Sequence, residues 1–126
     1  MKINSRTGYA VKALLELLSI VRKGKIVKPV TLESIATATK ISLSYLEQIF
    51  GKLGKAKIVT STRGPGGGYL LANYSSKITV FDIMMAVDNG EYEVPQWLDP
   101  SNTLVGNMKE TTLEALYLFQ NKEIVK

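Results

Sequence analysis

Apolar residues in the first part of the chain recur every three to four positions, which is the period of an amphipathic helix. The pattern predicts a helix from about Ser5 to Arg22. Its expected cap is Asn4 or Ser5, and Gly24 is its expected end. The basic stretch that follows is expected to be a loop with a short strand at residues 26–27. The predicted apolar stripe of the helix consists of Ala10, Leu14, Leu17, Leu18 and Val21.

Two shorter helices are predicted next, joined by a tight turn. Thr31 is the expected cap of the first. The second begins at Ser42 or Ser44, since Ser44 and Glu47 have the spacing of a capping box, and it runs to about Lys55. A short helix, a turn and a second helix that is apolar on one side form a helix-turn-helix pattern. The apolar side of the second helix consists of Leu46, Ile49, Phe50 and Leu53.

A β-hairpin is predicted after the helix pair. β-Branched residues at 57–62 indicate one strand, residues 63–68 a glycine-rich turn, and residues 69–71 the returning strand. Such a hairpin after a helix-turn-helix is typical of a wing. We therefore expect residues 1–75 to form a winged helix-turn-helix domain.

Residues 76–126 are expected to form one compact unit: a short helix at 79–87, a loop up to about Asn102, and one long C-terminal helix. Apolar residues along the last helix alternate at spacings of three and four, which is a heptad seam. We interpret the seam as a dimerisation interface, with packing inside the same chain as the alternative. The predicted fold is mainly α with a small β-wing. The seam and one leucine beside it comprise Val105, Met108, Thr112, Ala115, Phe119 and Leu116.

The chain contains neither cysteine nor histidine, which removes several kinds of chemistry. Disulfides, thiolate nucleophiles, cysteine-ligated clusters and imidazole bases are excluded. Only carboxylate sites for Mg²⁺ or Ca²⁺ remain open. We therefore predict no catalytic residue, no metal site and no cofactor, and we expect a protein that is not an enzyme.

The net charge of +5 is distributed unevenly along the chain. Residues 1–72 hold twelve Lys and Arg against three Glu, a net charge of +9, whereas residues 73–126 hold four Lys against eight acids, a net charge of −4. This asymmetry favours a half that faces a polyanion, with a merely solvated basic surface as the alternative. No stretch is apolar and long enough to span a membrane, and no signal-peptide pattern is recognised, so we expect a cytoplasmic protein without a membrane partner.

The polar side of the second short helix carries candidates for contact with double-stranded DNA. Short polar side chains near the N-terminus of such a helix reach base edges in the major groove, and cations further along reach phosphates. An ordinary solvated helix face is the alternative. The candidates are Ser44, Tyr45, Glu47 and Gln48 for bases, with Lys52 and Lys55 for phosphates.

The glycine-rich turn is a second candidate binding element. Its glycines let the backbone approach another surface closely, and its arginine has the charge to enter a narrow minor groove. The turn lacks the Gly-Lys-Ser/Thr ending of a phosphate-binding loop, and a flexible hairpin turn is the alternative. The candidates are Arg63, Gly64, Gly66, Gly67 and Tyr69.

Residues 41–50 and 63–71, with Val59 between them, resemble the Rrf2 (IscR-like) family of bacterial transcription regulators. The resemblance extends over essentially the whole chain. It implies a winged helix-turn-helix homodimer on promoter DNA. The second helix would lie in the major groove, Arg63 in the minor groove, and the C-terminal helix against the partner subunit.

One departure from the family bears directly on function. Many members ligate an iron–sulfur cluster through cysteines, with a histidine in IscR-like proteins, in the loop before the dimer helix. Here that loop, residues 89–101, has none of these ligands and is shorter. The resemblance therefore implies a clusterless regulator, expected to be a sequence-specific repressor. The alternative is a sensing module of the same fold that acts through a protein partner and binds DNA weakly or not at all. Trp97 would then be an interface anchor, and the other interpretation of Trp97 is that it covers the core.

A second departure lies at the end of the recognition helix. Gly51 and Gly54 occupy helix-interior positions, where each glycine costs roughly 1 kcal/mol relative to alanine. Lys57 stands where the family usually has glycine.

Overall fold

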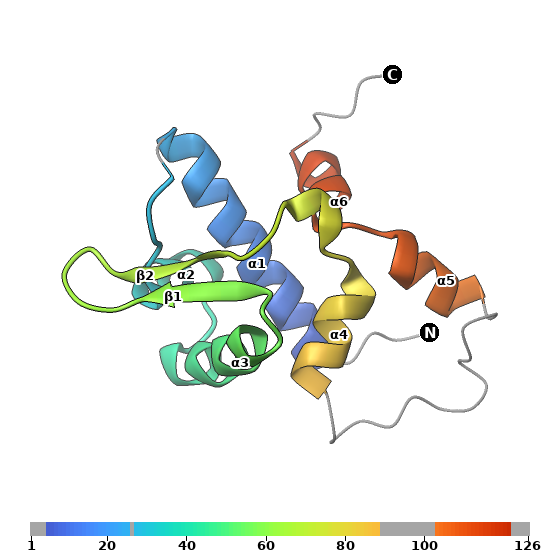
Figure 1. Ribbon diagram of the computed structural model, residues 1–126, viewed down its shortest axis with the longest axis horizontal. Coiled ribbons are helices and arrows are strands. Elements are labelled where there is room, and N and C mark those ends of the chain that lie inside the picture. Colours follow the sequence, from blue (N-terminus) through green and yellow to red (C-terminus); the bar gives the residue numbers. More distant parts are fainter. Residues whose placement is uncertain (1–4, 26, 89–102, 122–126) are drawn as a thin grey trace.

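The computed structural model describes residues 5–25, 27–88 and 103–121. Figure 1 shows α1 running through the centre, a two-stranded hairpin projecting on one side, and the C-terminal helices on the other. The mainly α fold with a small β-wing is therefore confirmed. In chain order the elements are α1 (Ser5–Gly24), α2 (Leu32–Thr39), α3 (Leu43–Lys55), β1 (Val59–Thr62), β2 (Gly68–Leu71), the 3₁₀ turn η1 (Ser75–Lys77), α4 (Val80–Asp88), α5 (Thr103–Glu110) and α6 (Leu113–Gln120).

Helix α1 is the centre of the core, because α2, α3, α4 and α6 all pack on it. Its predicted apolar stripe is confirmed, with Ala10, Leu14 and Leu17 fully buried. The helix extends to Gly24, and Lys25 then leaves it in a left-handed backbone conformation, φ 60°. No helix in the described part of the chain is both long and apolar enough to cross a membrane.

Side-chain caps fix the starts of α2 and α3. Thr31 caps α2 as predicted, because its hydroxyl oxygen accepts the Ser34 amide at 3.2 Å. Of the two starts predicted for α3, Ser42 is confirmed and the capping box at Ser44 is wrong. Ser42 is the cap of α3: its backbone is extended and its hydroxyl oxygen accepts the Tyr45 amide at 3.3 Å, which leaves Ser44 inside the first turn.

The apolar side of α3 is buried as predicted and holds this helix against α1 and α2. Burial of these side chains supplies the main stabilisation of the helix pair, because removal of apolar area from water is the dominant favourable term in folding. The side chains, each no more than 1% exposed, are Leu46, Ile49, Phe50 and Leu53.

The hairpin forms the predicted wing, with shifted strand ends. β1 begins at Val59 rather than at Lys57, because Lys57 closes the end of α3 in a left-handed conformation, φ 61°. β1 and β2 pair antiparallel, from Val59 opposite Leu71 to Thr62 opposite Gly68.

A third segment adds one bridge to the wing. The Val30 amide donates to the Tyr69 carbonyl oxygen at 2.9 Å, and the Tyr69 amide donates back at 2.8 Å. The strand predicted at residues 26–27 is therefore wrong for Val27, which is exposed and unpaired in the described hydrogen-bond pattern. The extra pairing falls at Val30, directly before the cap of α2.

The prediction of one long C-terminal helix is wrong, since α5 and α6 are separate helices. The chain is extended at Thr112, with φ −94° and ψ 158°, and the Thr112 hydroxyl accepts the Ala115 amide at 3.1 Å as the cap of α6. Thr112 also forms a β-bridge with Thr79. These long-range backbone bonds stop the helix and interrupt the heptad seam in its middle.

The two halves of the seam have different surroundings. Met108 on α5 packs with Val80 and Met84 of α4 in a small second core. On α6, Ala115 is exposed, Leu116 is half-buried, and Phe119 is 73% exposed.

The start of α1 is bonded to the end of α4. Asp88 is 3% exposed, and one of its carboxylate oxygens accepts the Thr7 hydroxyl at 2.7 Å. The other accepts Arg6, whose guanidinium also donates to the Val87 carbonyl oxygen at 3.3 Å. At the start of α4, Thr79 and Asp82 form a reciprocal capping box.

Several predicted features lie outside the described residues. They are the cap at Asn4, the strand residue Ile26, the loop 89–101 with Trp97, and the side chain of Val105.

Candidate nucleic-acid interface

The N-terminal half of α3 presents a polar face to solvent. Ser44, Glu47 and Gln48 are all exposed, because the opposite side of the same helix is buried in the core. The structure thus brings together three of the four side chains predicted to reach base edges.

Tyr45 has a different environment from its three neighbours. It is half-buried, and its ring meets the ring of Tyr9 edge-on, with centroids 5.6 Å apart. The ring also packs against the main core. Tyr45 therefore helps to fix α3 on α1 and borders the polar face rather than standing on it.

Lys52 is not part of the polar face either. Its ammonium group donates to the Val87 carbonyl oxygen at 3.3 Å, and the side chain is half-buried between α3 and α4. Sequence periodicity could not reveal this bond, because the acceptor lies 35 residues away at the end of another helix. Lys55, one turn further along, is exposed.

The turn of the wing depends on its glycines. Gly64 and Gly66 have positive φ angles of 90° and 76°, which side chains rarely adopt. The Gly67 amide donates to the Gly64 carbonyl oxygen at 2.9 Å, and a Cβ atom on Gly67 would overlap the Thr62 carbonyl. The turn is therefore built on backbone geometry rather than on side-chain packing.

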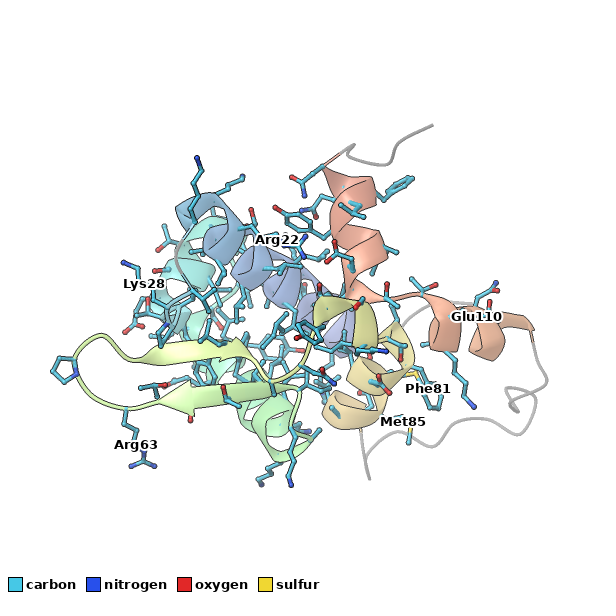
Figure 2. The ribbon with its side chains drawn as sticks, turned by 45° about the horizontal axis from the view of Figure 1, so that its top comes forward. Arg22, Lys28, Arg63, Phe81, Met85 and Glu110 are labelled. Atoms are coloured by element: carbon cyan, nitrogen blue, oxygen red, sulfur yellow. The ribbon has the colours of Figure 1, made fainter. Side chains whose placement is uncertain are left out.

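Arg63 stands at the edge of this turn. Its side chain is exposed and extends from the wing into solvent in Figure 2.

Tyr69 connects the wing to the rest of the fold. Its ring packs on Phe50 of α3, with centroids 5.0 Å apart at an interplanar angle of 62°. Its backbone makes both bonds to Val30 described above. Tyr69 thus ties the wing to α3 and to the segment before α2.

A hollow of about 290 Å³ lies between the start of α3 and the wing. Glu47 lines it from α3, and Gly64 and Gly67 line it from the wing. Thr31 and Glu33 at the start of α2 also line it, and neither was predicted as a contact. Their place beside α3 follows from the packing of α2 on α3, which local sequence patterns do not specify.

A polar helix face beside a glycine-built wing, on a helix-turn-helix core, defines a winged helix-turn-helix protein. The chain belongs to the Rrf2 family, described as an iron-dependent transcriptional regulator, whose pattern matches residues 3–124.

Relatives with assigned names support this membership. The HTH-type transcriptional regulator IscR of Photorhabdus laumondii subsp. laumondii is 46% identical over 88 residues, which cover 70% of this chain and 51% of that protein. IscR of Vibrio atlanticus is 48% identical over 88 residues, which cover 70% of this chain and 49% of that protein. The chain therefore spans about half the length of the curated relatives it matches.

Solved structures agree on the fold. IscR of T. potens matches with a TM-score of 0.78 and 27% identity, covering 100% of this chain and 93% of that one. CymR, the global cysteine regulator of B. subtilis, matches with a TM-score of 0.74 and 30% identity, covering 94% of this chain and 98% of that one.

The residues of this chain do not fit the iron–sulfur chemistry of the family. Thiolate and imidazole are the ligands of such clusters, and the sequence has no cysteine and no histidine. Among the described residues, no group of three or more Asp or Glu side chains is placed to hold a metal ion.

Proposed function

We propose that this chain binds a specific double-stranded DNA sequence as a homodimer and acts as a clusterless transcriptional repressor. In this arrangement α3 lies in the major groove and the wing reaches the adjacent minor groove. The observation that supports the proposal is the hollow lined by both Glu47 of α3 and Gly64 of the wing, because it brings the polar face of α3 next to the wing.

The chemistry of the α3 face supports base recognition. The Gln48 amide can pair with the two hydrogen-bonding groups that adenine presents in the major groove, and the Glu47 carboxylate can accept from the cytosine amino group. Ser44 can donate or accept. None of these three side chains packs in the core, so all three are available to a ligand.

The wing supplies a contact of another kind. A narrow minor groove concentrates negative potential, which attracts an inserted arginine. Arg63 has the exposure and the charge for this role, and glycines at 64, 66 and 67 let the backbone approach the sugar–phosphate strand without side-chain clashes.

The homodimer rests on the exposed apolar side of α6. Ala115 and Phe119 are four residues apart and therefore lie on the same side of this helix. A second copy of the chain is the proposed occupant, because a two-fold dimer sets two recognition helices about 34 Å apart on one face of DNA.

The test is selection of DNA from a random pool by the full chain, purified anaerobically and checked for the absence of cluster absorption. An enriched motif should bind at least ~10³-fold more tightly than scrambled DNA. Gln48→Ala and Arg63→Ala should each weaken binding of the motif by about 1–3 kcal/mol. Each variant should weaken binding because it loses the DNA contact of its own side chain. A repressor also predicts that deletion of the gene raises expression from a promoter that carries the motif.

Lys12→Ala serves as the matched control, because Lys12 is exposed on α1 and lines neither the α3 face nor the wing. It should leave the affinity for the motif within about twofold. If no motif is enriched and random DNA binds equally well, the proposal fails.

A further inference from the structure

A second groove, of about 550 Å³, lies between the end of α3 and α4. The α3–β1 connection, Asn73 and η1 close its other sides. Its floor is apolar, because Ile58 and Ile78 are buried beneath it and Met85 and Ala86 form a wall. Figure 2 marks Met85 at this side of the molecule, far from Arg63 on the wing. The basic residues that line it are Lys52, Lys55, Lys57 and Lys77.

The charge of this groove is strongly positive. Among the described residues that line the groove there are four ammonium groups, from α3, the α3–β1 connection and η1, and one carboxylate, Asp82. That carboxylate already accepts the Thr79 amide at 3.0 Å as part of the α4 cap. Lys55, Lys57 and Lys77 are all exposed at the rim. Such a setting attracts an anion with several acceptor oxygens.

Lys57 is held in the groove in a conformation that disfavours it. Its φ of 61° lies in the left-handed region, where glycine is the usual residue. Its amide donates to the Gly54 carbonyl oxygen at 3.0 Å, so the conformation is fixed by the end of α3. Lys25 and Lys40 share this left-handed conformation, so the backbone angle fixes where the Lys57 side chain begins but does not by itself indicate a use for it.

The groove is distinct from the hollow between α3 and the wing, although it is lined by Lys52 and Lys55, which the sequence predicted to reach DNA phosphates. It shares no lining residue with the hollow between α3 and the wing. Lys55 and Ser44 lie at opposite ends of α3, about 16 Å apart at 1.5 Å per residue.

We propose that the lysine groove is a binding site for a small phosphate-bearing molecule with an apolar part. The phosphate groups lie among the ammonium groups of Lys55, Lys57 and Lys77, and the apolar part lies on Ile58 and Met85. The volume falls in the range of small-molecule sites. A bound molecule would bridge the recognition helix to α4, which gives the ligand direct contact with the element that reads DNA.

The experiment uses the full chain without DNA, titrated calorimetrically with inorganic pyrophosphate and with ATP. Both should bind, and ATP should bind more tightly because it offers an apolar base to the groove floor. Lys57→Gly and Lys77→Ala should each weaken both affinities by on the order of tenfold, because each removes a charged hydrogen-bond donor. Lys57→Gly should keep the fold, since glycine adopts the required φ more easily than lysine.

Lys25→Gly is the matched control. Lys25 is exposed and has nearly the same left-handed φ, 60°, but it lies at the end of α1 and does not line the groove. This variant loses the same charge and relieves the same strain, and it should bind pyrophosphate as the wild type does. If Lys25→Gly weakens pyrophosphate binding as much as Lys57→Gly does, the binding is a general attraction of anions to a basic protein, and the proposed site is wrong.

One other outcome overturns the proposal, and the DNA affinity of Lys57→Gly then shows whether the groove contacts DNA instead. Absence of binding by pyrophosphate and ATP at millimolar concentration rules out a small-molecule site. If these probes do not bind but Lys57→Gly lowers DNA affinity and reduces its salt slope by about one, the groove contacts the DNA backbone instead. Affinity of the wild type for its selected motif is measured separately, so failure of the groove and failure of DNA reading are distinguishable.

Discussion

At the scale of single residues, Arg22 and Glu114 form the main polar link between α1 and α6. The Arg22 guanidinium donates to one Glu114 carboxylate oxygen at 3.1 Å and pairs with the other, which also accepts the Ser75 hydroxyl. Arg22 also lies over the Tyr117 ring, 4.6 Å from its centroid. Hydrogen bonding from Arg22 lowers the pKa of Glu114 below its ordinary value of 4.5; burial opposes the shift, and Ser75 adds to it.

This lowered pKa predicts a pH dependence of stability. Because the folded state favours the ionised carboxylate, the contribution of Glu114 is complete above pH 4.5 and is lost as the pH falls through its lower folded pKa. Glu114→Gln should therefore destabilise the fold at pH 7, by about 0.5–1 kcal/mol for a partly exposed pair. The difference from wild type should vanish at low pH, and urea unfolding at a series of pH values measures it.

Glu110→Gln provides the comparison, since Glu110 is exposed on α5 and outside this network. It should unfold like the wild type at every pH. A Glu114→Gln variant that remains equally less stable at low pH would show that the carboxylate charge is not responsible.

The sequence correctly predicted which side of α3 is exposed, because in a helix the apolar positions repeat every three to four residues. Ser44 and Gln48 are exposed because Leu46 and Ile49, on the other side of α3, are buried. It could not place Lys52, whose partner is a backbone carbonyl on a helix far along the chain. Side chains that bond across elements need the fold before they can be assigned.

At the scale of elements, the wing is held by close backbone approach. Gly68 has a φ of 144°, and a Cβ atom there would overlap the Val30 carbonyl that pairs with Tyr69. Alanine at 68 must therefore shift the wing away from the segment before α2.

Gly68→Ala should destabilise the protein by about 1–3 kcal/mol and weaken DNA binding by loss of wing position. Chemical denaturation measures the first effect. Gly54→Ala is the opposing control, because nothing lies within 4 Å of a Cβ there and the site is inside a helix. It should stabilise by about 1 kcal/mol. Equal and small effects of both changes would mean that the Val30–Tyr69 approach does not constrain the wing.

The broken C-terminal helix marks the limit of periodicity at this scale. Spacings of three and four continue through Thr112, so the sequence pattern predicts one helix. The break comes from a bridge to Thr79, 33 positions earlier, together with the hydroxyl cap on α6. The spacing of apolar residues along the chain cannot reveal a pairing between residues so far apart in sequence.

At the scale of the whole molecule, the charge asymmetry and the exposed side of α6 fit one assembly. The basic half contains α3 and the wing, and the acidic half contains α6. Joined through α6, two copies would set both basic halves toward DNA and keep the acidic halves away from phosphates.

Phe119→Asp should convert the dimer to monomers, because it places a charge in the proposed apolar contact. Sedimentation of the full chain without DNA at micromolar concentration measures this. Val27→Asp is the matched control, since Val27 is 76% exposed, against 73% for Phe119, and lies outside α6. A wild-type chain that is already monomeric would contradict the assembly, as would equal loss of the dimer in both variants.

The break between α5 and α6 at Thr112 affects where the sequences of family members can differ. The Leu113 amide donates to the Ile78 carbonyl oxygen at 2.8 Å, and the Val80 amide donates to Thr111 at 3.0 Å. The start of α4 and α1 therefore both hold α6 in place, and Leu116 of α6 also packs on the small core that includes Met108 of α5. A change of length between Asp88 and the start of α5 at Thr103 would leave these two backbone bonds intact. Members of the family can therefore differ in the length and the residues of the segment between α4 and α5 while α6 keeps its position.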